Sequence, residues 1–430
     1  MDKTGYRHIP SALSNWITFL ICALPIRAVP TFVELLCGCM VSSSGFVCQA
    51  WVSLEMRRQW GSYYKWLQTG RWSWLALGRR MAQLVASVYA GQERYLVIDD
   101  THVLRASKKA PGSTIHHQHG NKPNLAQYVR GQCWVSLAVV APGRTGFAAI
   151  PLLARLMRAT GNHSKLVAAE ALLRVVRESF ASSCVLMDSW YMRGNLIKQL
   201  LGMDYSVIGQ VRKDTALYRK PLPRKGRGRP RLYGEKMTPQ NVLSMPEHRH
   251  RLHLYGKMQW VRLRSDILLA RFLKGQEVRA VWAQFEDEHG KLSRPRLIIS
   301  THVGMSATAI VEAYAKRWAI EPMFNQLKNG WGIKETWQQS RQVLARWVQL
   351  RSVAFGLTQL LALTQDAQGI PQLTPWRLGR PMTAGRVRMG LAKILVRFDV
   401  RACWNPKSRK FDFDKPHRPP PKAENRPHAA

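Results

Sequence analysis

Acidic residues are scarce in this chain. Its 430 residues include 26 Asp and Glu against 65 Lys and Arg, which gives a formal net charge of +39 at pH 7. Such an excess of one sign repels itself in a compact protein unless a polyanion neutralises it. Many of the cations are Arg, whose planar guanidinium suits phosphates and base edges. The composition therefore indicates a nucleic-acid partner in preference to a merely soluble basic surface.

Paired cysteines and long uncharged apolar runs are also missing. The seven cysteines are scattered without a C-x-x-C pair, which argues against a disulfide framework or a zinc site and favours a reducing cytosol. The apolar segment Trp16–Met40 is interrupted by Pro25, Arg27, Pro30 and Glu34, so no uncharged run reaches the roughly 18 residues of a membrane span. The segment also lacks the pattern of a signal peptide. We therefore expect a cytoplasmic protein without a membrane partner.

The most informative segment that is present is Tyr314–Lys328, Y-A-K-R-W-A-I-E-P-M-F-N-Q-L-K, which predicts part of a helix. At about 100° per residue, Tyr314, Arg317, Glu321 and Lys328 share one narrow stripe. A carboxylate is a hard oxygen ligand for Mg²⁺, and the neighbouring cations suit phosphate groups. The stripe predicts half of a phosphoryl-transfer site. The alternative is a surface ion-pair network, because Arg317 and Glu321 have i, i+4 spacing.

Two predicted strands end in acids, at the place where an α/β sheet usually presents catalytic groups. The first strand, Arg94–Asp100, ends in Asp99 and Asp100, and the second, Cys184–Met187, is followed by Asp188. A two-metal site needs carboxylates from separate elements around ions about 4 Å apart. Acids at strand ends are also common as turn residues or helix caps. Their order before the helix stripe, in a basic chain, favours the two-metal interpretation.

The spacing Y-x2-R-x3-E-x6-K, filled by Tyr314, Arg317, Glu321 and Lys328, resembles the Y-R-E-K signature of bacterial insertion-sequence transposases of the DDE class. The runs D-D-T at 99–101 and V-L-M-D at 185–188 resemble the two acidic strands of that family. The resemblance covers about residues 94–364. It implies an α/β fold with an RNase H-like mixed sheet flanked by helices, a mainly β insertion and an N-terminal helical domain.

The expected domain boundaries follow from this resemblance and from the shifts in composition. Residues 1–90 form a helical domain that binds DNA ends, and residues 91–212 and 295–365 form the catalytic core. Residues 213–294 form a basic, β-rich insertion. Residues 366–430 form a basic C-terminal region whose tail, from Lys407, is rich in Pro, Lys and Arg and is expected to be disordered.

Carried over by motif position, the implied catalytic triad is Asp100, Asp188 and Glu321, which would bind Mg²⁺, with Mn²⁺ able to replace it. Asp100 is preferred to Asp99 because it directly precedes Thr101. On strict alternation the two adjacent side chains point to opposite faces of the sheet, so only one of them leads. The residues implied to grip the phosphates beside the scissile bond are Tyr314, Arg317 and Lys328.

The implied function is a DNA transposase that cleaves at terminal inverted repeats and joins the ends to target DNA. Its partner would be double-stranded DNA, both element ends and target, bound by a homodimer in the nucleoid of a bacterial cytoplasm. Two alternatives stay open. One is a non-catalytic DNA-binding protein derived from a transposase, and the other is a stand-alone RNase H-like nuclease, which would nick DNA without joining ends.

Three further groups of residues have both a functional and a structural interpretation. The segment Lys225–Arg231, K-G-R-G-R-P-R, resembles an AT-hook for the minor groove, or is a solvated basic loop; its arginines are Arg227, Arg229 and Arg231. The histidines of H-H-x-H either bind zinc or line a polar loop near DNA; they are His116, His117 and His119. Four tryptophans either stack on bases or belong to the core; they are Trp260, Trp282, Trp331 and Trp337.

Overall fold

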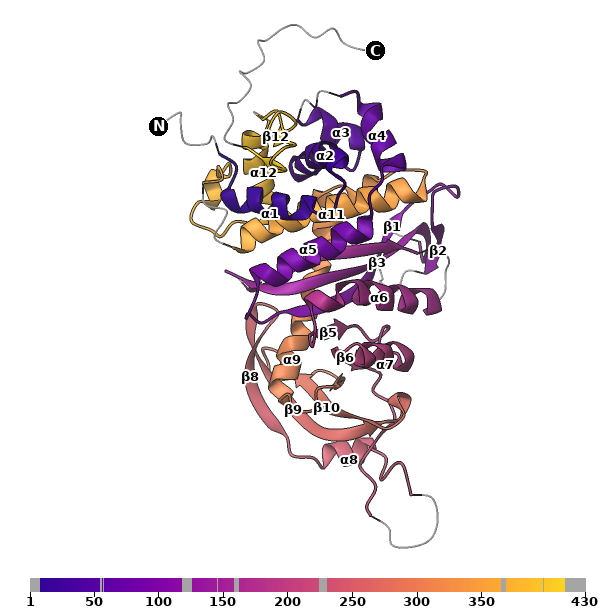
Figure 1. Cartoon of the computed structure of the whole chain (residues 1–430). Helices are drawn as coiled ribbons and strands as arrows, with labels where there is room; N and C mark the ends of the chain where they lie inside the picture. The colour runs from indigo at the N-terminus through magenta and orange to yellow at the C-terminus, as the bar shows by residue number, and fades with distance from the viewer. Residues whose placement is uncertain are drawn as a thin grey trace.

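One mixed sheet runs through the centre of the computed structural model, and helices lie on both of its faces (Figure 1). The structure describes residues 8–54, 56, 58–117, 126–144, 146–157, 162–223, 230–364, 369–396 and 398–413. Within these residues the sheet has 11 strands, in the order β2-β3-β1-β5-β6-β11-β10-β9-β7, with β4 paired to β3 and β8 paired to β9. The strands are β1 (Tyr95–Leu104), β2 (Ser113–His117), β3 (Tyr128–Gly143), β4 (Gly146–Leu156), β5 (Cys184–Met187), β6 (Ser206–Val211), β7 (Leu217–Tyr218), β8 (His248–Leu254), β9 (Lys257–Ala270), β10 (Gln276–Phe285) and β11 (Arg296–Ser300).

The helices fall into an N-terminal group, a group that flanks the sheet and a C-terminal group. The α-helices are α1 (Ser11–Ile21), α2 (Val29–Val41), α3 (Val47–Val52), α4 (Trp60–Thr69), α5 (Trp74–Val88), α6 (Asn162–Val176), α7 (Gly194–Gly202), α8 (Pro239–Leu243), α9 (Ala307–Lys316), α10 (Ile320–Asn325), α11 (Arg341–Leu363) and α12 (Ala384–Leu395). Short 3-10 turns include η3 (Arg271–Leu273), η4 (Arg317–Ala319) and η6 (Ile333–Glu335), and a π turn, η5 (Gln326–Gly330), follows α10. Among the described residues, no helix has both the length and the apolar character needed to cross a bilayer.

Strand β1 lies between β3 and β5, in the half of the sheet without the inserted strands. It is antiparallel to β3 and parallel to β5. Its apolar residues alternate between two hydrophobic clusters. Leu96 and Ile98 pack in the cluster that contains side chains of α5, α6 and α7, whereas Tyr95 and Val97 pack in the cluster that contains side chains of α9 and α10. A strand that is apolar on both faces is typical of a sheet covered by helices on both sides. Successive residues after Ile98 therefore face different helices.

Helix α11 is buried along almost its whole length, because α2, α4, α5, α12 and β4 all pack on it. Two of its arginines bind backbone carbonyls instead of acids. The guanidinium of Arg351, which is fully buried, donates to the carbonyl oxygens of Trp331 and Ser42, and that of Arg346 donates to the carbonyl oxygens of Leu67 and Trp72. A buried cation is tolerated when its N–H groups are satisfied. These contacts fasten the N-terminal helices to α11, which itself packs on β4.

The strands inserted between β6 and β11 continue the central sheet, because β11 pairs antiparallel with β6 and β10 pairs with β11. Figure 1 shows β8, β9 and β10 as a strongly curved ribbon at the end of the molecule opposite the N-terminal helices. The turn between β8 and β9 has Tyr255 at φ 54° and Gly256 at φ 80°. Positive φ at two successive positions is what a tight two-residue hairpin requires.

The expected fold class is confirmed: the chain is α/β, with an RNase H-like mixed sheet flanked by helices, a mainly β insertion and a helical N-terminal part. Three details differ from the expectations. The helix that Ser306 caps is divided by η4, because Pro322 has no N–H to offer the carbonyl of Trp318. His116 and His117, expected at a zinc site or in a polar loop, lie on strand β2. The tail expected to be disordered from Lys407 begins with a small hairpin of β12 (Trp404–Asn405) and β13 (Lys410–Phe411), and residues 414–430 lie outside the described part.

Candidate active site

The acids of the two predicted strands lie side by side, although the first strand does not end at its acids as predicted: β1 continues to Leu104, so Asp99 and Asp100 lie in its middle. Strands β1 and β5 are parallel neighbours, with Ile98 opposite Met187, so the next positions along the two strands are Asp99 and Asp188. Asp188 comes directly after β5, where its Oδ1 accepts the backbone N–H groups of Trp190 at 3.0 Å and Tyr191 at 3.1 Å. This turn holds the Asp188 carboxylate just after the end of β5, beside the part of β1 that carries Asp99 and Asp100.

Asp99 points to the face covered by α9 and α10. Its Oδ2 lies 3.0 Å from Nη1 of Arg317, the second residue of the Y-R-E-K spacing. Burial, followed by the charge of Asp188, raises the pKa of Asp99 to about 7, although Arg317 opposes the shift. Burial also raises the pKa of Asp188. A buried carboxylate whose ionisation is disfavoured by a second, half-buried carboxylate marks a place where additional positive charge is stabilising.

Asp100 points to the opposite face, toward α6. The Nζ of Lys165 lies 3.2 Å from Oδ1 and 3.0 Å from Oδ2 of Asp100, and the Tyr191 hydroxyl donates to Oδ1 at 3.0 Å. The thiol of Cys133 donates to Oδ2 at 3.5 Å. Lys165 also lies over the ring of Trp190, 4.4 Å from its centroid. The Asp100 carboxylate thus already has a cation on both of its oxygens.

The four residues of the Y-R-E-K spacing reach this cluster to different degrees. Arg317 lies 5.9 Å from the Tyr314 ring centroid. Burial lowers the pKa of Arg317, but the groups around it outweigh burial and raise the pKa overall; those groups are Tyr314, Asp99, Asp188 and Glu321. Glu321 is solvent-exposed on the first turn of α10. Burial also raises the pKa of Tyr314. The spacing therefore brings its Arg to Asp99, with Tyr314 and Glu321 near that Arg.

Lys328 lies near a pair of histidines beside Asp100. The rings of His102 and His116 are stacked with their centroids 4.3 Å apart. Burial, followed by the charge of His116, lowers the pKa of His102 to about 4, and Lys165 and Lys328 act in the same direction. His102 is therefore neutral at physiological pH. Three cations, Lys165, Arg317 and Lys328, surround the acids from different elements, which is the electrostatic setting of a phosphate site.

Several predicted residues lie elsewhere or beyond the described part. Arg231 is exposed in the inserted segment, and Arg227 and Arg229 lie outside the described residues, as does His119. Trp331 is buried, with an exposed fraction of 1%, whereas Trp260 and Trp337 are 40% and 55% exposed.

Sequence reasoning did not identify two neighbours of Asp100. Lys165 lies on α6, about 65 residues after the first acids, and nothing in its local sequence distinguishes it from other basic helix residues. Tyr191, in contrast, stands only three residues after Asp188, so the sequence could have indicated that it lies close to the site. The contact between Asp99 and Arg317 was also missed, although strand alternation separated Asp99 from Asp100.

The donor set decides which metal the cluster suits. Asp100, Asp188 and Glu321 offer carboxylate oxygens, the hard ligands that Mg²⁺ and Mn²⁺ accept. The Lys165 ammonium on both oxygens of Asp100 shows that this carboxylate is placed to receive positive charge. A mixed set of Asp100, His102 and Cys133 also lies close together, within 4.8 Å. Burial raises the pKa of the Cys133 thiol, which disfavours the thiolate that zinc requires. The carboxylates therefore fit a hard divalent cation better than zinc.

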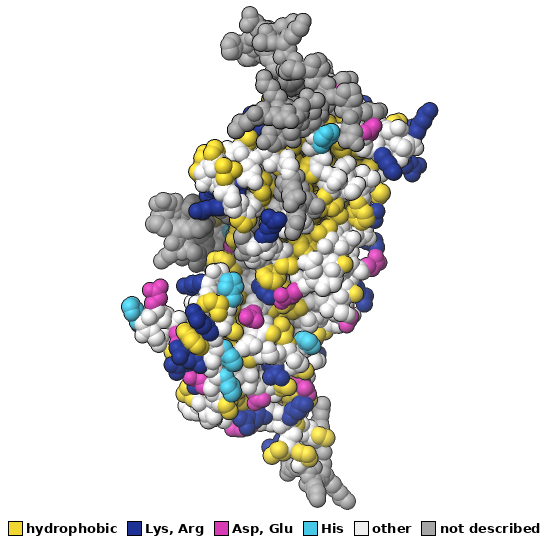
Figure 2. Space-filling model, turned by 90° about the vertical axis from the view of Figure 1, so that its left-hand side faces the viewer, with side chains coloured by type: hydrophobic (Ala, Val, Ile, Leu, Met, Phe, Trp, Pro, Cys, Tyr) yellow, Lys and Arg dark blue, Asp and Glu magenta, His cyan; other side chains and the backbone are white. Residues whose placement is uncertain are grey.

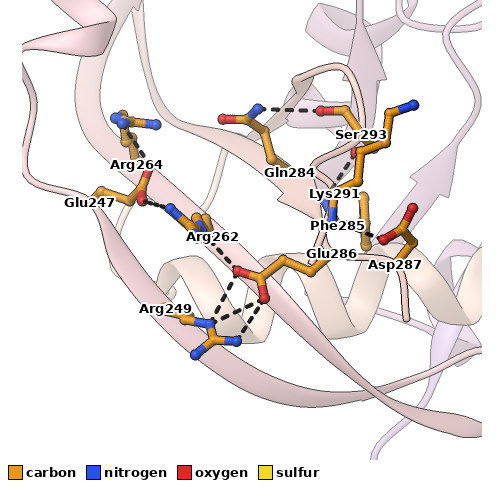
Figure 3. A network of polar contacts seen from close by, with 10 residues as sticks. All are labelled: Glu247, Arg249, Arg262, Arg264, Gln284, Phe285, Glu286, Asp287, Lys291 and Ser293. Atoms are coloured by element: carbon orange, nitrogen blue, oxygen red, sulfur yellow. Dashed lines mark hydrogen bonds and ion pairs between the residues drawn. The ribbon is translucent and has the colours of Figure 1, made fainter. Parts of the chain in front are cut away.

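A second charged network holds the inserted strands together. Figure 3 shows Glu286 between two arginines: its carboxylate accepts from Nη2 of Arg249 at 2.7 Å and from Nε of Arg262 at 2.8 Å. Glu247 accepts from Arg262 at 3.1 Å and from Arg264 at 2.6 Å. Because Arg249 and Arg262 are direct cross-strand partners, their like charges would repel each other without Glu286. Hydrogen bonds from these two arginines lower the pKa of Glu286.

The outer surface of this ribbon remains basic. Figure 2 shows Lys, Arg and His side chains gathered over the lower part of this face, with acidic side chains among them. Strand β8 contributes exposed residues of this kind, which are His248, Arg249, Arg251 and His253. The guanidinium of Arg249 lies 4.1 Å from the ring centroid of Trp260. The network therefore orders the arginines of the ribbon while leaving positive charge on its surface.

Comparison with known proteins identifies one family. A family model described as DDE superfamily endonuclease matches residues 36–266, more than half of the chain. The matched part includes the N-terminal helices from α2 onward, both acidic strand ends and β8, and it stops before the helix of Glu321. No curated protein matches the chain.

Proposed function

The chain belongs to the DDE superfamily endonucleases, and from this premise we propose that it is the DNA transposase of an insertion sequence. It cleaves DNA at terminal inverted repeats and joins the ends to target DNA by two-metal-ion phosphoryl transfer. The observation that carries the proposal is the meeting of the acids of β1 and β5 with the Y-R-E-K spacing. Asp188 follows β5 beside the acids of β1, and Arg317 of the spacing lies 3.0 Å from Asp99.

The roles of the residues follow their positions. Asp100, Asp188 and Glu321 hold the divalent cations, Mg²⁺ with Mn²⁺ able to replace it. When bound, the cations activate the attacking oxygen and stabilise the leaving oxygen. Asp99 has a different task, because its carboxylate is buried and paired with Arg317. It holds the Arg317 guanidinium at the strand end, while Tyr314, Arg317 and Lys328 hold the phosphates beside the scissile bond.

Lys165 places positive charge beside Asp100. Its ammonium contacts both carboxylate oxygens, so a divalent cation held by Asp100 would compete with Lys165 for at least one of them. Lys165 retains a second support, since it lies over the Trp190 ring. The side chain can therefore withdraw from Asp100 without losing all of its contacts.

The partner in this proposal is double-stranded DNA, both element ends and target, held by a homodimer in the bacterial nucleoid. The support is the net charge of +39 together with the basic surface of the inserted strands. Pairing two element ends in one complex requires two active sites, which a homodimer supplies.

The test is cleavage of a duplex carrying the element's inverted repeat, in Mg²⁺. We expect Asp188→Ala and Glu321→Ala to abolish cleavage while binding the duplex as well as the parent does. Asp100→Asn should in addition lose Mn²⁺ binding, measured by electron paramagnetic resonance, whereas Asp99→Asn should keep it. Cleavage by Asp188→Ala at the parental rate would show that the acids do not form the site. Nicking without joining of ends, in a strand-transfer assay, would make the protein a nuclease instead of a transposase.

A further inference from the structure

A cavity of about 640 Å³ lies directly behind the loop that follows Asp188. The loop residues 189–193 line it on one side, the turn between β6 and β7 on another, and η3 on a third. The loop thus has the acid cluster on one side and the cavity on the other, because the Trp190 and Tyr191 N–H groups bind Asp188.

Positive charge dominates this cavity. Three arginines line it, Arg193, Arg212 and Arg271, and all three are exposed. Asp214 is the only acid among its described lining residues, and it pairs with Arg212 at 3.2 Å. Arg193 and Arg271 have no acidic partner of this kind among the described residues. Arg249 and Arg262 in the inserted ribbon are paired with Glu286, whereas Arg193 and Arg271 can bind an anion that is not part of the protein.

The backbone adds donors to the same place. Helix α7 begins at the cavity, its N-cap Arg193 makes no side-chain capping bond, and no acid lies in its first turn. The first N–H groups of a helix are free to bind an anion when no side chain caps them. A Cβ on Gly194 would lie 2.3 Å from the carbonyl oxygen of Phe272, so only glycine lets α7 start this close to η3.

Like-charged side chains also lie near this junction, outside the cavity lining. Partial desolvation, followed by the charge of Lys274, just after η3, lowers the pKa of Lys198, on α7. Neighbouring cations are stabilised when an anion lies near them. The lining arginines and the open helix end therefore favour an anionic ligand, and the lysine pair adds positive charge beside them.

We infer that this cavity binds backbone phosphates of a DNA strand where the strand leaves the acid cluster. The inference rests on the proposed function for the identity of the polyanion. A DNA strand is favoured over a free nucleotide because the loop 189–193 is shared between the cavity and the acid cluster, so one strand can occupy both. The cavity therefore extends the DNA-binding surface past the scissile bond on the α7 side.

The test is the salt dependence of DNA binding in EDTA, measured by fluorescence anisotropy with a labelled duplex. The variant is Arg193→Ala/Arg271→Ala, and the matched control, Arg144→Ala/Arg174→Ala, removes the same charge from exposed positions away from the cavity. Each lost phosphate contact lowers the slope of log K against log salt by about 0.9. We expect the cavity variant to lose about 0.9 to 1.8 of slope, the control to stay close to the parent, and Arg193→Lys/Arg271→Lys to keep most of the parental slope.

Equal slopes for the cavity variant and the control would overturn the inference, provided that thermal melting shows both to be folded. A thermal shift by inorganic pyrophosphate that the cavity variant loses, with an unchanged DNA slope, would assign the cavity to a free polyphosphate and also overturn it. Because binding is measured without a divalent cation, failure of DNA cleavage would contradict the proposed function while leaving this result intact.

Discussion

Asp99 is expected to destabilise the metal-free protein at neutral and alkaline pH. Its pKa is raised from the usual 3.8 to about 7, chiefly by burial and then by Asp188. At 1.36 kcal/mol per pKa unit, this difference corresponds to about 4 kcal/mol. Because the folded-state pKa lies above the unfolded-state value, the destabilisation is fully present above about pH 7 and disappears as the pH falls toward about 4.

The perturbation that exposes this effect is Asp99→Asn. Asn has nearly the shape of the protonated carboxyl and cannot ionise, but it leaves Arg317 without its 3.0 Å charged partner. The raised pKa of Asp99 already includes the opposing effect of Arg317, so we expect Asp99→Asn to be more stable than the parent by up to about 4 kcal/mol at about pH 8. The gain should shrink as the pH falls and vanish near about pH 4, where the parental carboxyl is protonated in both the folded and the unfolded protein. Urea unfolding in EDTA across this pH range measures both quantities.

The matched control is Asp214→Asn, since Asp214 is an exposed acid whose side chain is 63% accessible. Its effect on the free energy of unfolding should be small and independent of pH. The reasoning is refuted if Asp99→Asn is less stable than the parent at about pH 8, or if the two proteins differ by a constant amount at every pH. Either result would mean that the pair with Arg317 outweighs the burial of the Asp99 charge.

Three further changes test the framework around the site. Glu286→Gln should lower the melting temperature, because the side chain is only 4% accessible and separates two arginines, whereas Glu288→Gln, at an exposed position, should not. Arg105→Met should cost about 3 kcal/mol of unfolding free energy, because this guanidinium is 4% exposed and donates to several backbone carbonyls just after the Glu321 helix. Gly256→Ala should cost about 1 kcal/mol or more, because φ is 80°, while Gly61→Ala, in a helix with open space, should be neutral or stabilising.

Local patterns predicted the elements well where the pattern is short. The strand Cys184–Met187 was predicted with its observed bounds, because four apolar residues lie between polar neighbours. The segment Tyr314–Lys328 was predicted as part of a single helix, but it is divided into α9, η4, α10 and η5. Pro322 indicated an interruption, but whether a helix bends or re-forms after a proline depends on its packing.

The sequence could predict only those parts of the site that short motifs reveal, and not the contacts between segments far apart in the chain. Alternation separates Asp99 from Asp100, but it does not say which face carries α6 and which carries α9. That choice depends on the packing of helices that lie far away in the sequence. The same holds for Lys165, whose contact with Asp100 joins segments 65 residues apart. Sequence therefore identified the acids and the Y-R-E-K spacing, and the structure supplied the partner of each acid.

The partners explain how two adjacent acids can be held in the middle of one strand, β1. Each acid has its own cation, delivered by a helix on its own face of the sheet: Arg317 for Asp99 and Lys165 for Asp100. The two cations differ in whether they can keep their contact with the acid when another ligand binds. Arg317 uses Nη1 for Asp99, and a guanidinium has five N–H donors in a planar fork, so it can hold Asp99 and a phosphate together. Lys165 is a compact charge that occupies both oxygens of Asp100, so it must move for another cation to bind there. Under the proposed function, the contact between Asp99 and Arg317 can therefore persist when DNA binds, whereas the contact between Asp100 and Lys165 would open for a divalent cation.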